Sequence, residues 1–123
     1  RLSRPVGRQY LPFVQELDAD GLTHTWVGQF RRGVIERMYR NRVILLINMT
    51  CPVYCSFCFR KHKESRHRPN PSPAEVVAAV DYVRRSPEIK EVLITGGDPL
   101  LNRANLVAAV DGLQEVPQVQ TVR

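Results

Sequence analysis

An uninterrupted apolar run at residues 43–47, followed closely by all three cysteines of the chain, constrains the fold most strongly. The run Val-Ile-Leu-Leu-Ile shows no alternation of apolar and polar residues. This pattern is typical of a strand covered on both faces, as in a parallel α/β sheet. Cys51, Cys55 and Cys58 follow in the spacing C-x3-C-x2-C. The sequence therefore predicts a buried strand that carries a cysteine-bearing loop at its carboxyl end.

The residues after the cysteines alternate between helix and strand patterns. Ser72, Pro73 and Glu75 have the order of an N-cap, a first-turn proline and a capping-box glutamate, so a helix begins there. Residues 91–95 and 119–122 have strand patterns, and residues 103–114 have a helix pattern. The faces expected to be buried are Val76, Val80 and Val83 in the first helix and Leu106, Val110 and Leu113 in the second. The order β-α-β-α-β predicts a parallel sheet with right-handed crossovers.

Residues 1–41 differ from this pattern. Prolines and glycines interrupt any long periodicity there, so we expect a short helical and irregular N-terminal extension. Residues 42–123 would form only three strands and two helices, which leaves a sheet edge and much apolar surface uncovered. We therefore expect two parts, 1–41 and 42–123, in a chain that is truncated from a longer α/β protein.

The composition of the chain gives an expectation for its cellular compartment. The chain of 123 residues is 43% apolar and 24% charged, as in globular proteins. No stretch approaches the roughly 20 apolar residues of a membrane span, and none has the pattern of an export signal. An odd number of clustered cysteines argues against an oxidising compartment. We expect a cytoplasmic protein without a membrane segment.

The cysteine spacing suits a metal centre better than a disulfide. Three thiolate ligands would leave one iron of a [4Fe–4S] cluster without a protein ligand, and a small molecule could bind there. The alternative is zinc, because His62 extends the pattern to C-x3-C-x2-C-x3-H, a plausible Cys3His site. A third reading is that the cysteines are unrelated core residues.

The formal net charge is +6, and much of it lies in residues 60–68. A basic segment of this kind can bind nucleic acid. It lacks, however, the interleaved aromatic residues of a single-strand stacking platform. A solvated basic loop, or one that faces an anionic substrate or cofactor, fits the segment better.

A second loop follows the next predicted strand. Thr95-Gly96-Gly97-Asp98-Pro99 begins where that strand ends. Paired glycines permit close backbone approach, although they also suit an ordinary tight turn. Functional loops of parallel α/β folds lie at the carboxyl ends of the strands, so this loop and the cysteine loop should share one face. A cluster that holds a bulky ligand needs a second loop beside it, whereas a structural zinc site does not.

These motifs resemble those of the radical S-adenosylmethionine (SAM) enzymes. Cys-Pro-Val-Tyr-Cys-Ser-Phe-Cys-Phe-Arg-Lys-His and Leu-Ile-Thr-Gly-Gly-Asp-Pro-Leu-Leu are similar to the lysine 2,3-aminomutase family, over about residues 39–123. The resemblance implies a partial (β/α) barrel that carries a [4Fe–4S] cluster, SAM and pyridoxal phosphate (PLP). It also implies that SAM is cleaved to a 5′-deoxyadenosyl radical and that an amino group migrates on a PLP-bound amino acid.

The resemblance assigns roles residue by residue. Cys51, Cys55 and Cys58 would bind the cluster, and Phe57 matches the aromatic residue of the cofactor-binding motif. The segment Gly96-Gly97-Asp98 would receive the amino group of SAM. Arg60 would pair with the substrate carboxylate, a task that suits the planar guanidinium. Tyr39 and Arg42 would contact the PLP phosphate, whereas Met38 stands where the family has a basic residue, and the lysine that binds PLP would lie beyond residue 123.

The function expected is therefore that of an amino-acid 2,3-aminomutase, most simply one acting on lysine. Alternatives in the same family use arginine or glutamate, or act in the modification of a translation factor. The alternative of another class is a zinc-stabilised basic module that binds nucleic acid through residues 60–68. The enzyme would have an amino acid as its small-molecule substrate and a reductant such as flavodoxin or ferredoxin, and it is compatible with a homo-oligomer.

Overall fold

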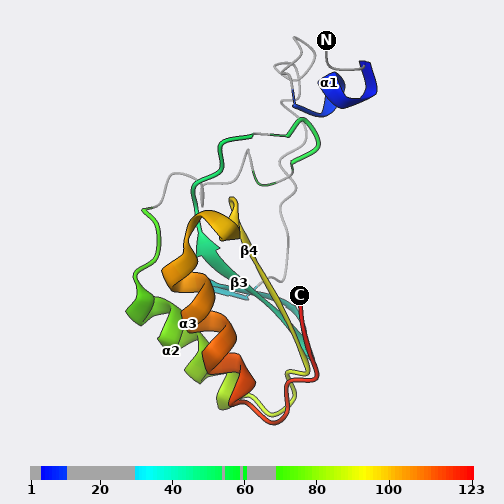
Figure 1. Ribbon diagram of the computed structural model, residues 1–123. Coiled ribbons are helices and arrows are strands. Elements are labelled where there is room, and N and C mark those ends of the chain that lie inside the picture. The colour runs from blue at the N-terminus through cyan, green and yellow to red at the C-terminus, as the bar shows by residue number, and fades with distance from the viewer. Residues whose placement is uncertain (1–3, 11–29, 54, 59, 61–68) are drawn as a thin grey trace.

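The computed structural model describes residues 4–10, 30–53, 55–58, 60 and 69–123, which form one mixed sheet with two long helices (Figure 1). The short helix α1 spans Arg4–Tyr10. Within the described residues the sheet has five strands in the order β1-β2-β3-β4-β5. The strands are β1 (Phe30–Arg32), β2 (Ile35–Tyr39), β3 (Arg42–Asn48), β4 (Glu91–Gly96) and β5 (Thr121–Val122).

The parallel part of the sheet confirms the predicted α/β order. Strand β3 pairs in parallel with β4, and β4 pairs in parallel with β5. Helix α2 (Pro73–Arg84) connects β3 to β4, while the 3₁₀ helix η3 (Pro99–Leu101) and helix α3 (Arg103–Gln114) connect β4 to β5. Figure 1 shows α2 and α3 side by side on one face of the sheet. Both parallel connections therefore cover the same face, and the carboxyl ends of β3 and β4 lie together at one end of the sheet.

The antiparallel part of the sheet was not predicted. The sequence suggests short helices and loops before residue 42, but β1 and β2 form a hairpin whose second strand pairs antiparallel with β3. Gly33 makes the turn between the two strands with a φ of 55°. Strand β2 holds its place through pairing and ion pairs: Ile35 lies opposite Leu45, and Arg37 donates to Glu88 at 2.7 Å and to Tyr82 at 2.8 Å. The residues of β2, Ile-Glu-Arg-Met-Tyr, do not alternate regularly between apolar and polar, so no strand was predicted there.

The capping box predicted for α2 is present. The backbone N–H of Glu75 donates to Ser72 Oγ at 3.3 Å, and the backbone N–H of Ser72 donates to Glu75 Oε2 at 2.8 Å. The hydrogen bonds from the backbone and side chain of Ser72 lower the pKa of Glu75. The side chains of Ser72 and Glu75 therefore stabilise the first turn of α2.

The hydrophobic core lies between the sheet and the two long helices. It includes Val43, Leu45, Ile47, Val76, Val80, Val83, Val92, Ala109 and Leu113. The predicted buried face of α2 is confirmed. In α3 the buried residues are Asn105, Ala109 and Leu113, so the prediction is confirmed for Leu113, while Leu106 packs half-buried against the core and Val110 is half-buried. The small Ala109 and the hydrogen-bonded Asn105 permit close packing against β3 where larger aliphatic residues were expected.

The opposite face of the sheet carries the side chain of Glu36 together with apolar residues of β3. Side chains alternate between faces along a strand, so Glu36, Ile44 and Leu46 point away from the two long helices. In the part of the chain that the structure describes, no helix covers this face (Figure 1). No described helix is long and apolar enough to span a bilayer.

Candidate metal centre and cofactor site

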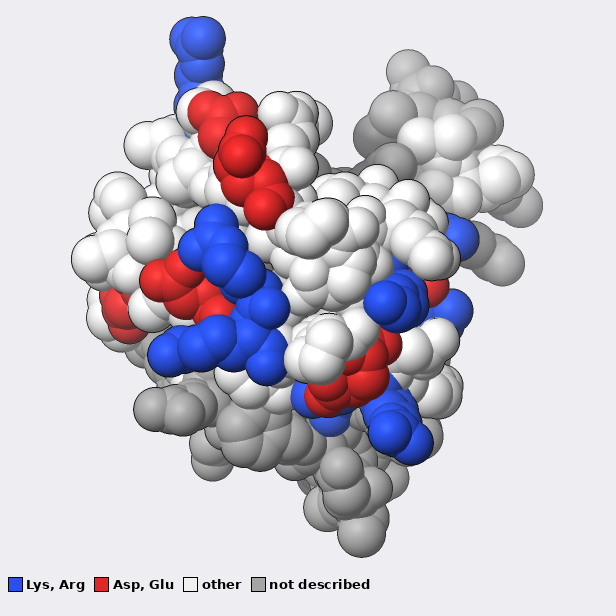
Figure 2. All heavy atoms as spheres, turned by 90° about the horizontal axis from the view of Figure 1, so that it is seen from below, with Lys and Arg blue, Asp and Glu red and all other residues white. Residues whose placement is uncertain are grey.

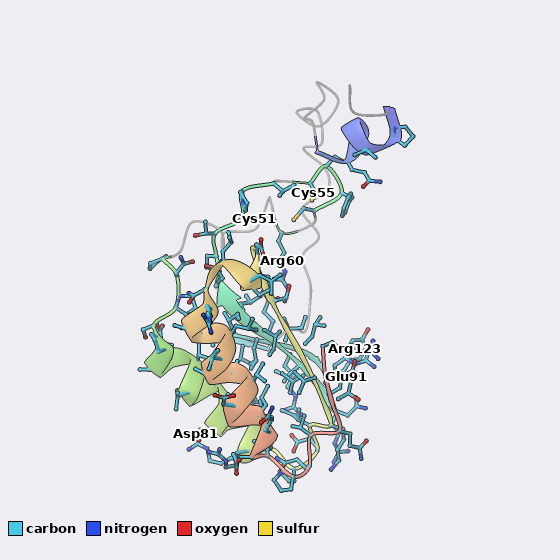
Figure 3. All side chains as sticks on the ribbon, in the orientation of Figure 1. Cys51, Cys55, Arg60, Asp81, Glu91 and Arg123 are labelled. Atoms are coloured by element: carbon cyan, nitrogen blue, oxygen red, sulfur yellow. The ribbon has the colours of Figure 1, made fainter. Side chains whose placement is uncertain are left out.

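The cysteine loop, residues 49–58, leaves the carboxyl end of β3. Cys51, Cys55 and Cys58 are all half-buried and none is in a disulfide. A turn connects Cys55 and Cys58, because the N–H of Cys58 donates to the carbonyl of Cys55 at 2.9 Å. Figure 3 shows Cys51 and Cys55 beyond the end of β3, with Arg60 nearer the sheet. The loop is thus held at the strand end that the sequence predicts.

The donor set suits a cluster. Among the described residues, no group of three histidine, cysteine or acidic side chains could hold a single metal ion as they stand. A [4Fe–4S] cluster takes each thiolate on a different iron, so its ligands need not converge on one point. The three thiols come from one short loop, and a cluster bound by them would leave one iron for another ligand. His62, which the zinc alternative needs, lies outside the described residues, as do residues 61–68 of the basic segment.

Two asparagine side chains hold the two ends of the stretch that contains the cysteines. Asn70 accepts a hydrogen bond from the N–H of Met49 at 2.7 Å and donates to Thr50 Oγ1 at 3.1 Å. Asn105, on α3, donates through Nδ2 to the carbonyls of Ile47 at 2.9 Å and Pro71 at 2.8 Å. The second side chain therefore connects the end of β3 with the start of the segment that enters α2.

A third asparagine joins the cysteine loop to the glycine segment, residues 95–99. Asn48 Nδ2 donates to the carbonyls of Thr50 at 3.1 Å and Asp98 at 2.6 Å. Backbone bonds run beside it, from the N–H of Gly97 to the Asn48 carbonyl at 2.6 Å and from the N–H of Asp98 to the Thr50 carbonyl at 2.8 Å. The two loops that the topology rule places on one face are therefore directly hydrogen-bonded.

The paired glycines are required by this contact. Gly96 has a φ of 144°, and a Cβ there would overlap the carbonyl oxygen of Asn48. A Cβ on Gly97 would overlap the carbonyl oxygen of Thr50. Asp98 turns its carboxylate forward, where Oδ1 accepts from the N–H of Leu100 at 3.1 Å and caps η3. Close backbone approach, rather than a simple tight turn, explains the two glycines.

Arg60 is buried rather than part of a solvated loop. Its side chain donates through Nη1 to Glu36 Oε2 at 3.0 Å. Arg60 is 6% exposed and Glu36 2% exposed. Glu36 lies on the face of the sheet opposite the two long helices, so this buried ion pair lies on that side too. Glu36 was not predicted to be a site residue, because it stands 24 residues before Arg60 in a segment that was not predicted to be a strand.

Tyr39 and Arg42 lie together at the opposite end of the sheet. The Arg42 guanidinium stands 5.5 Å from the centre of the Tyr39 ring. Arg42 Nε donates to Glu91 Oε2 at 2.6 Å. Arg123 Nε contacts Glu91 Oε1 at 3.3 Å, and Figure 3 shows these two residues next to each other. Strand β3 rises by about 3.3 Å per residue, so Arg42 is about 20 Å from the carboxyl end of the strand. The structure does not bring these two residues to the cysteine loop.

The surface around Arg42 is mixed in charge. Figure 2 views the molecule from the end opposite the cysteine loop, and basic and acidic side chains lie side by side there. Exposed or half-exposed ion pairs include Arg42–Glu91, Arg123–Glu91, Arg37–Glu88 and Arg84–Asp81. The described part of this surface therefore has no single-sign patch of the kind that binds a nucleic-acid backbone.

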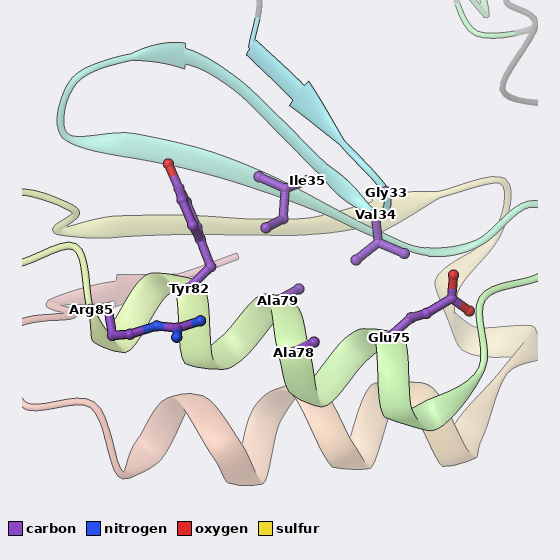
Figure 4. A pocket seen from close by; sticks show the side chains of 8 residues that line it. All are labelled: Gly33, Val34, Ile35, Glu75, Ala78, Ala79, Tyr82 and Arg85. Carbon is purple, nitrogen blue, oxygen red and sulfur yellow. The ribbon is translucent and has the colours of Figure 1, made fainter.

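Phe57, the remaining predicted residue, is 70% exposed at the tip of the turn in the cysteine loop. A separate pocket of about 240 Å³ opens between β2 and α2 (Figure 4). It is lined by Gly33, Val34, Ile35, Glu75, Ala78, Ala79, Tyr82 and Arg85. None of the predicted site residues lines this pocket, which lies on the helix-covered side of the sheet.

Comparison with known proteins agrees with this geometry. The family model of the radical SAM superfamily matches residues 45–116, which contain both the cysteine loop and the glycine segment. The chain is 45% identical over 67 residues to an L-lysine 2,3-aminomutase of Methanococcus maripaludis, covering 54% of this chain and 16% of that protein.

Two further relatives align over more of the chain. It is 32% identical over 125 residues to an L-lysine 2,3-aminomutase of Clostridium subterminale, covering 97% of this chain and 30% of that protein. It is 36% identical over 92 residues to a glutamate 2,3-aminomutase of Clostridioides difficile, covering 74% of this chain and 22% of that protein. The chain thus spans less than a third of the length of these relatives. It belongs to the radical SAM superfamily, and its relatives place it in the lysine 2,3-aminomutase family of that superfamily.

Proposed function

We propose that this chain is part of a radical SAM 2,3-aminomutase that acts on a free amino acid, with L-lysine as the first candidate. The observation that carries the proposal is the joining of the cysteine loop to the glycine segment at the carboxyl ends of β3 and β4. A cluster with an open iron and a ligand beside it would need both loops on one face. Relatives named as lysine and glutamate 2,3-aminomutases supply the reaction type.

In this proposal Cys51, Cys55 and Cys58 bind three irons of a [4Fe–4S] cluster. Gly96, Gly97 and Asp98 form the neighbouring wall for SAM, and Phe57 lies on the loop between the last two cysteines. When bound, the cluster and SAM would supply a radical that removes a hydrogen atom from the substrate. The protein's own task is to hold these loops in fixed register and to keep water away from the reacting groups.

Arg60 is the proposed contact for the substrate carboxylate. A buried guanidinium attracts an anion more strongly than an exposed one, because less water competes for it. Glu36 balances this charge and keeps the guanidinium in place. The proposed substrate would therefore lie on the side of the sheet opposite the two long helices.

PLP dependence is a further part of the proposal. Arg42 and Arg123 around Glu91 carry a net charge of +1 (two cations and one anion), beside the hydroxyl-bearing ring of Tyr39. Such a group can contribute to a phosphate site. The family resemblance supplies the rest of the expectation. A cytoplasmic flavodoxin or ferredoxin is the expected electron donor.

The testing experiment is electron paramagnetic resonance (EPR) of the full-length protein, reconstituted anaerobically with iron and sulfide and then reduced, with and without SAM. We expect a [4Fe–4S]⁺ signal that changes when SAM is added. The Cys58→Ser variant should lose the signal. A colourless protein that binds zinc and gives no signal would refute the proposal and favour the zinc-binding module.

Substrate assignment requires a second step. The reconstituted enzyme is incubated with SAM, reductant and PLP, and with L-lysine, L-glutamate or L-arginine in parallel. Mass spectrometry after chromatography detects the 3-amino isomer. Formation of the isomer from one amino acid identifies the substrate, whereas SAM cleavage without any isomer would support a radical SAM enzyme of another reaction type.

A further inference from the structure

We propose that Asn48 is a positioning residue that sets the separation between the cysteine loop and the glycine segment, and so determines how tightly SAM binds. This inference rests on the proposed function, because it assumes that SAM lies between those two loops. Asn48 is the last residue of β3, so it stands where the strand passes into the cysteine loop. The bond network of this one side chain carries the inference.

Both polar atoms of the Asn48 amide make hydrogen bonds. A side-chain amide has two N–H donors and one carbonyl acceptor. Both donors go to backbone carbonyls: that of Thr50 in the cysteine loop at 3.1 Å and that of Asp98 in the glycine segment at 2.6 Å. The acceptor Oδ1 receives the N–H of Thr50 at 3.4 Å. One planar group therefore binds both loops and fixes the direction of each.

Because Asn48 is buried, losing its hydrogen bonds should weaken the contact between the two loops. Asn48 is 1% exposed, so water cannot replace a lost donor without opening the junction between the loops. The bond from Asn48 to Asp98 lies beside the backbone bonds from Gly97 to Asn48 and from Asp98 to Thr50. Loss of the side-chain bond would leave the backbone pair to hold the glycine segment alone. The segment that the proposal assigns to SAM would then be less firmly placed.

The chain offers a matched control in Asn105. This residue is also 1% exposed, and its Nδ2 also donates to two backbone carbonyls, those of Ile47 and Pro71. Its side-chain bonds connect α3 with the two ends of the cysteine-bearing stretch, and within the described residues none of them reaches the glycine segment. Changing Asn105 therefore removes two equally buried N–H donors, but it leaves the hydrogen bond between Asn48 and Asp98 in place.

The first measurement is hydrogen–deuterium exchange on the full-length protein without SAM, using Asn48→Asp and Asn105→Asp. Aspartate has nearly the shape of asparagine, but its carboxylate cannot donate and would face carbonyl oxygens. We expect the amides of Gly97 and Asp98 to exchange at least about tenfold faster in Asn48→Asp, and to stay within about twofold of wild type in Asn105→Asp. If Asn48→Asp does not fold, Asn48→Ser, which keeps one donor, should show a smaller change in the same direction.

The second measurement titrates SAM into each reconstituted variant while the EPR signal is followed. We expect Asn48→Asp to keep the iron content of wild type but to raise the Kd for SAM by about tenfold, as the loss of one or two buried hydrogen bonds predicts. Asn105→Asp should stay within about twofold of the wild-type Kd. A simple loss of stability would affect both variants alike.

Two results would overturn the inference: an unchanged Kd in Asn48→Asp, or an equal rise in both variants. A wild-type protein whose cluster ignores SAM would refute the proposed function and the SAM part of the inference together. The exchange measurement separates these failures, because it uses neither cluster nor SAM and still decides whether Asn48 holds the two loops together.

Discussion

Replacing Arg60 with methionine should destabilise the protein strongly, because it removes the cation that faces the buried carboxylate of Glu36. The two side chains are 8% and 3% exposed, and their N–O separation is 3.0 Å. At an effective dielectric constant of about 20, two unit charges at that separation attract by about 5.5 kcal/mol. Removing one partner of a buried pair costs about 3–5 kcal/mol. The expected loss in free energy of unfolding for Arg60→Met is therefore about 3–5 kcal/mol.

The double variant Arg60→Met, Glu36→Leu is the informative comparison. Replacing a buried ion pair with apolar side chains of similar volume is often neutral or stabilising, so the double variant should recover most of the loss. Urea denaturation of the full-length protein, followed by circular dichroism, measures both. A loss below about 1 kcal/mol in Arg60→Met, or a double variant as unstable as the single one, would show that the pair is not buried as described.

The conservative variant Arg60→Lys separates stability from substrate binding. Lysine keeps the positive charge toward Glu36 but lacks the planar fork that binds a carboxylate through two parallel bonds. We expect Arg60→Lys to keep more of the stability than Arg60→Met and to raise the KM for the amino-acid substrate about tenfold or more. An unchanged KM would remove Arg60 from the proposed carboxylate site while leaving the ion pair intact.

Three other perturbations test the scaffold. Ser72→Ala removes the capping box of α2 and should lower the free energy of unfolding by about 1 kcal/mol in urea denaturation; no change would argue against the cap. The hydrogen bond from Arg37 lowers the pKa of Glu88, so this pair stabilises the fold above the ordinary glutamate pKa of about 4.3 and the contribution is lost as pH falls through the lowered value. Glu88→Gln should accordingly flatten the dependence of stability on pH in the acid range, and an unaltered pH profile would refute the assignment. Gly97→Ala should force the glycine segment away from the Thr50 carbonyl, so the amide of Asp98 should exchange at least about tenfold faster; wild-type exchange would contradict the close approach.

The parallel half of the sheet could be predicted because its signals are local. The apolar run of β3, the capping box of α2 and the helix pattern of α3 each lie within a short stretch of sequence. The hairpin before β3 could not be predicted, because Arg37 and Glu36 acquire their partners only in the folded chain, from Glu88 and Arg60. Glu36 and Arg37 stand together between the apolar residues of β2, so the strand lacks the regular alternation that a local pattern would show.

The candidate site likewise has features that could be predicted from the sequence and features that could not. The rule that loops meet at the carboxyl ends of parallel strands predicted that the cysteine loop and the glycine segment would share one face. The rule contains nothing about asparagine, so Asn48 and Asn105 were missed, although a polar residue at the end of a buried apolar run was a usable signal. Tyr39 and Arg42 came from family resemblance alone, and topology places them at the far end of β3.

The glycine pair has two explanations that act at the same place. Family resemblance assigns Gly96 and Gly97 to SAM, whereas the structure requires them for backbone contact with Asn48 and Thr50. These explanations are compatible, because a segment without side chains can pack against one loop and still offer backbone groups to a ligand. It follows that a glycine variant that no longer binds SAM would not demonstrate a contact with SAM, since the same change disrupts the cofactor-free protein. Only a variant that leaves the glycines in place and alters their support, as Asn48→Asp does against Asn105→Asp, can separate the two causes.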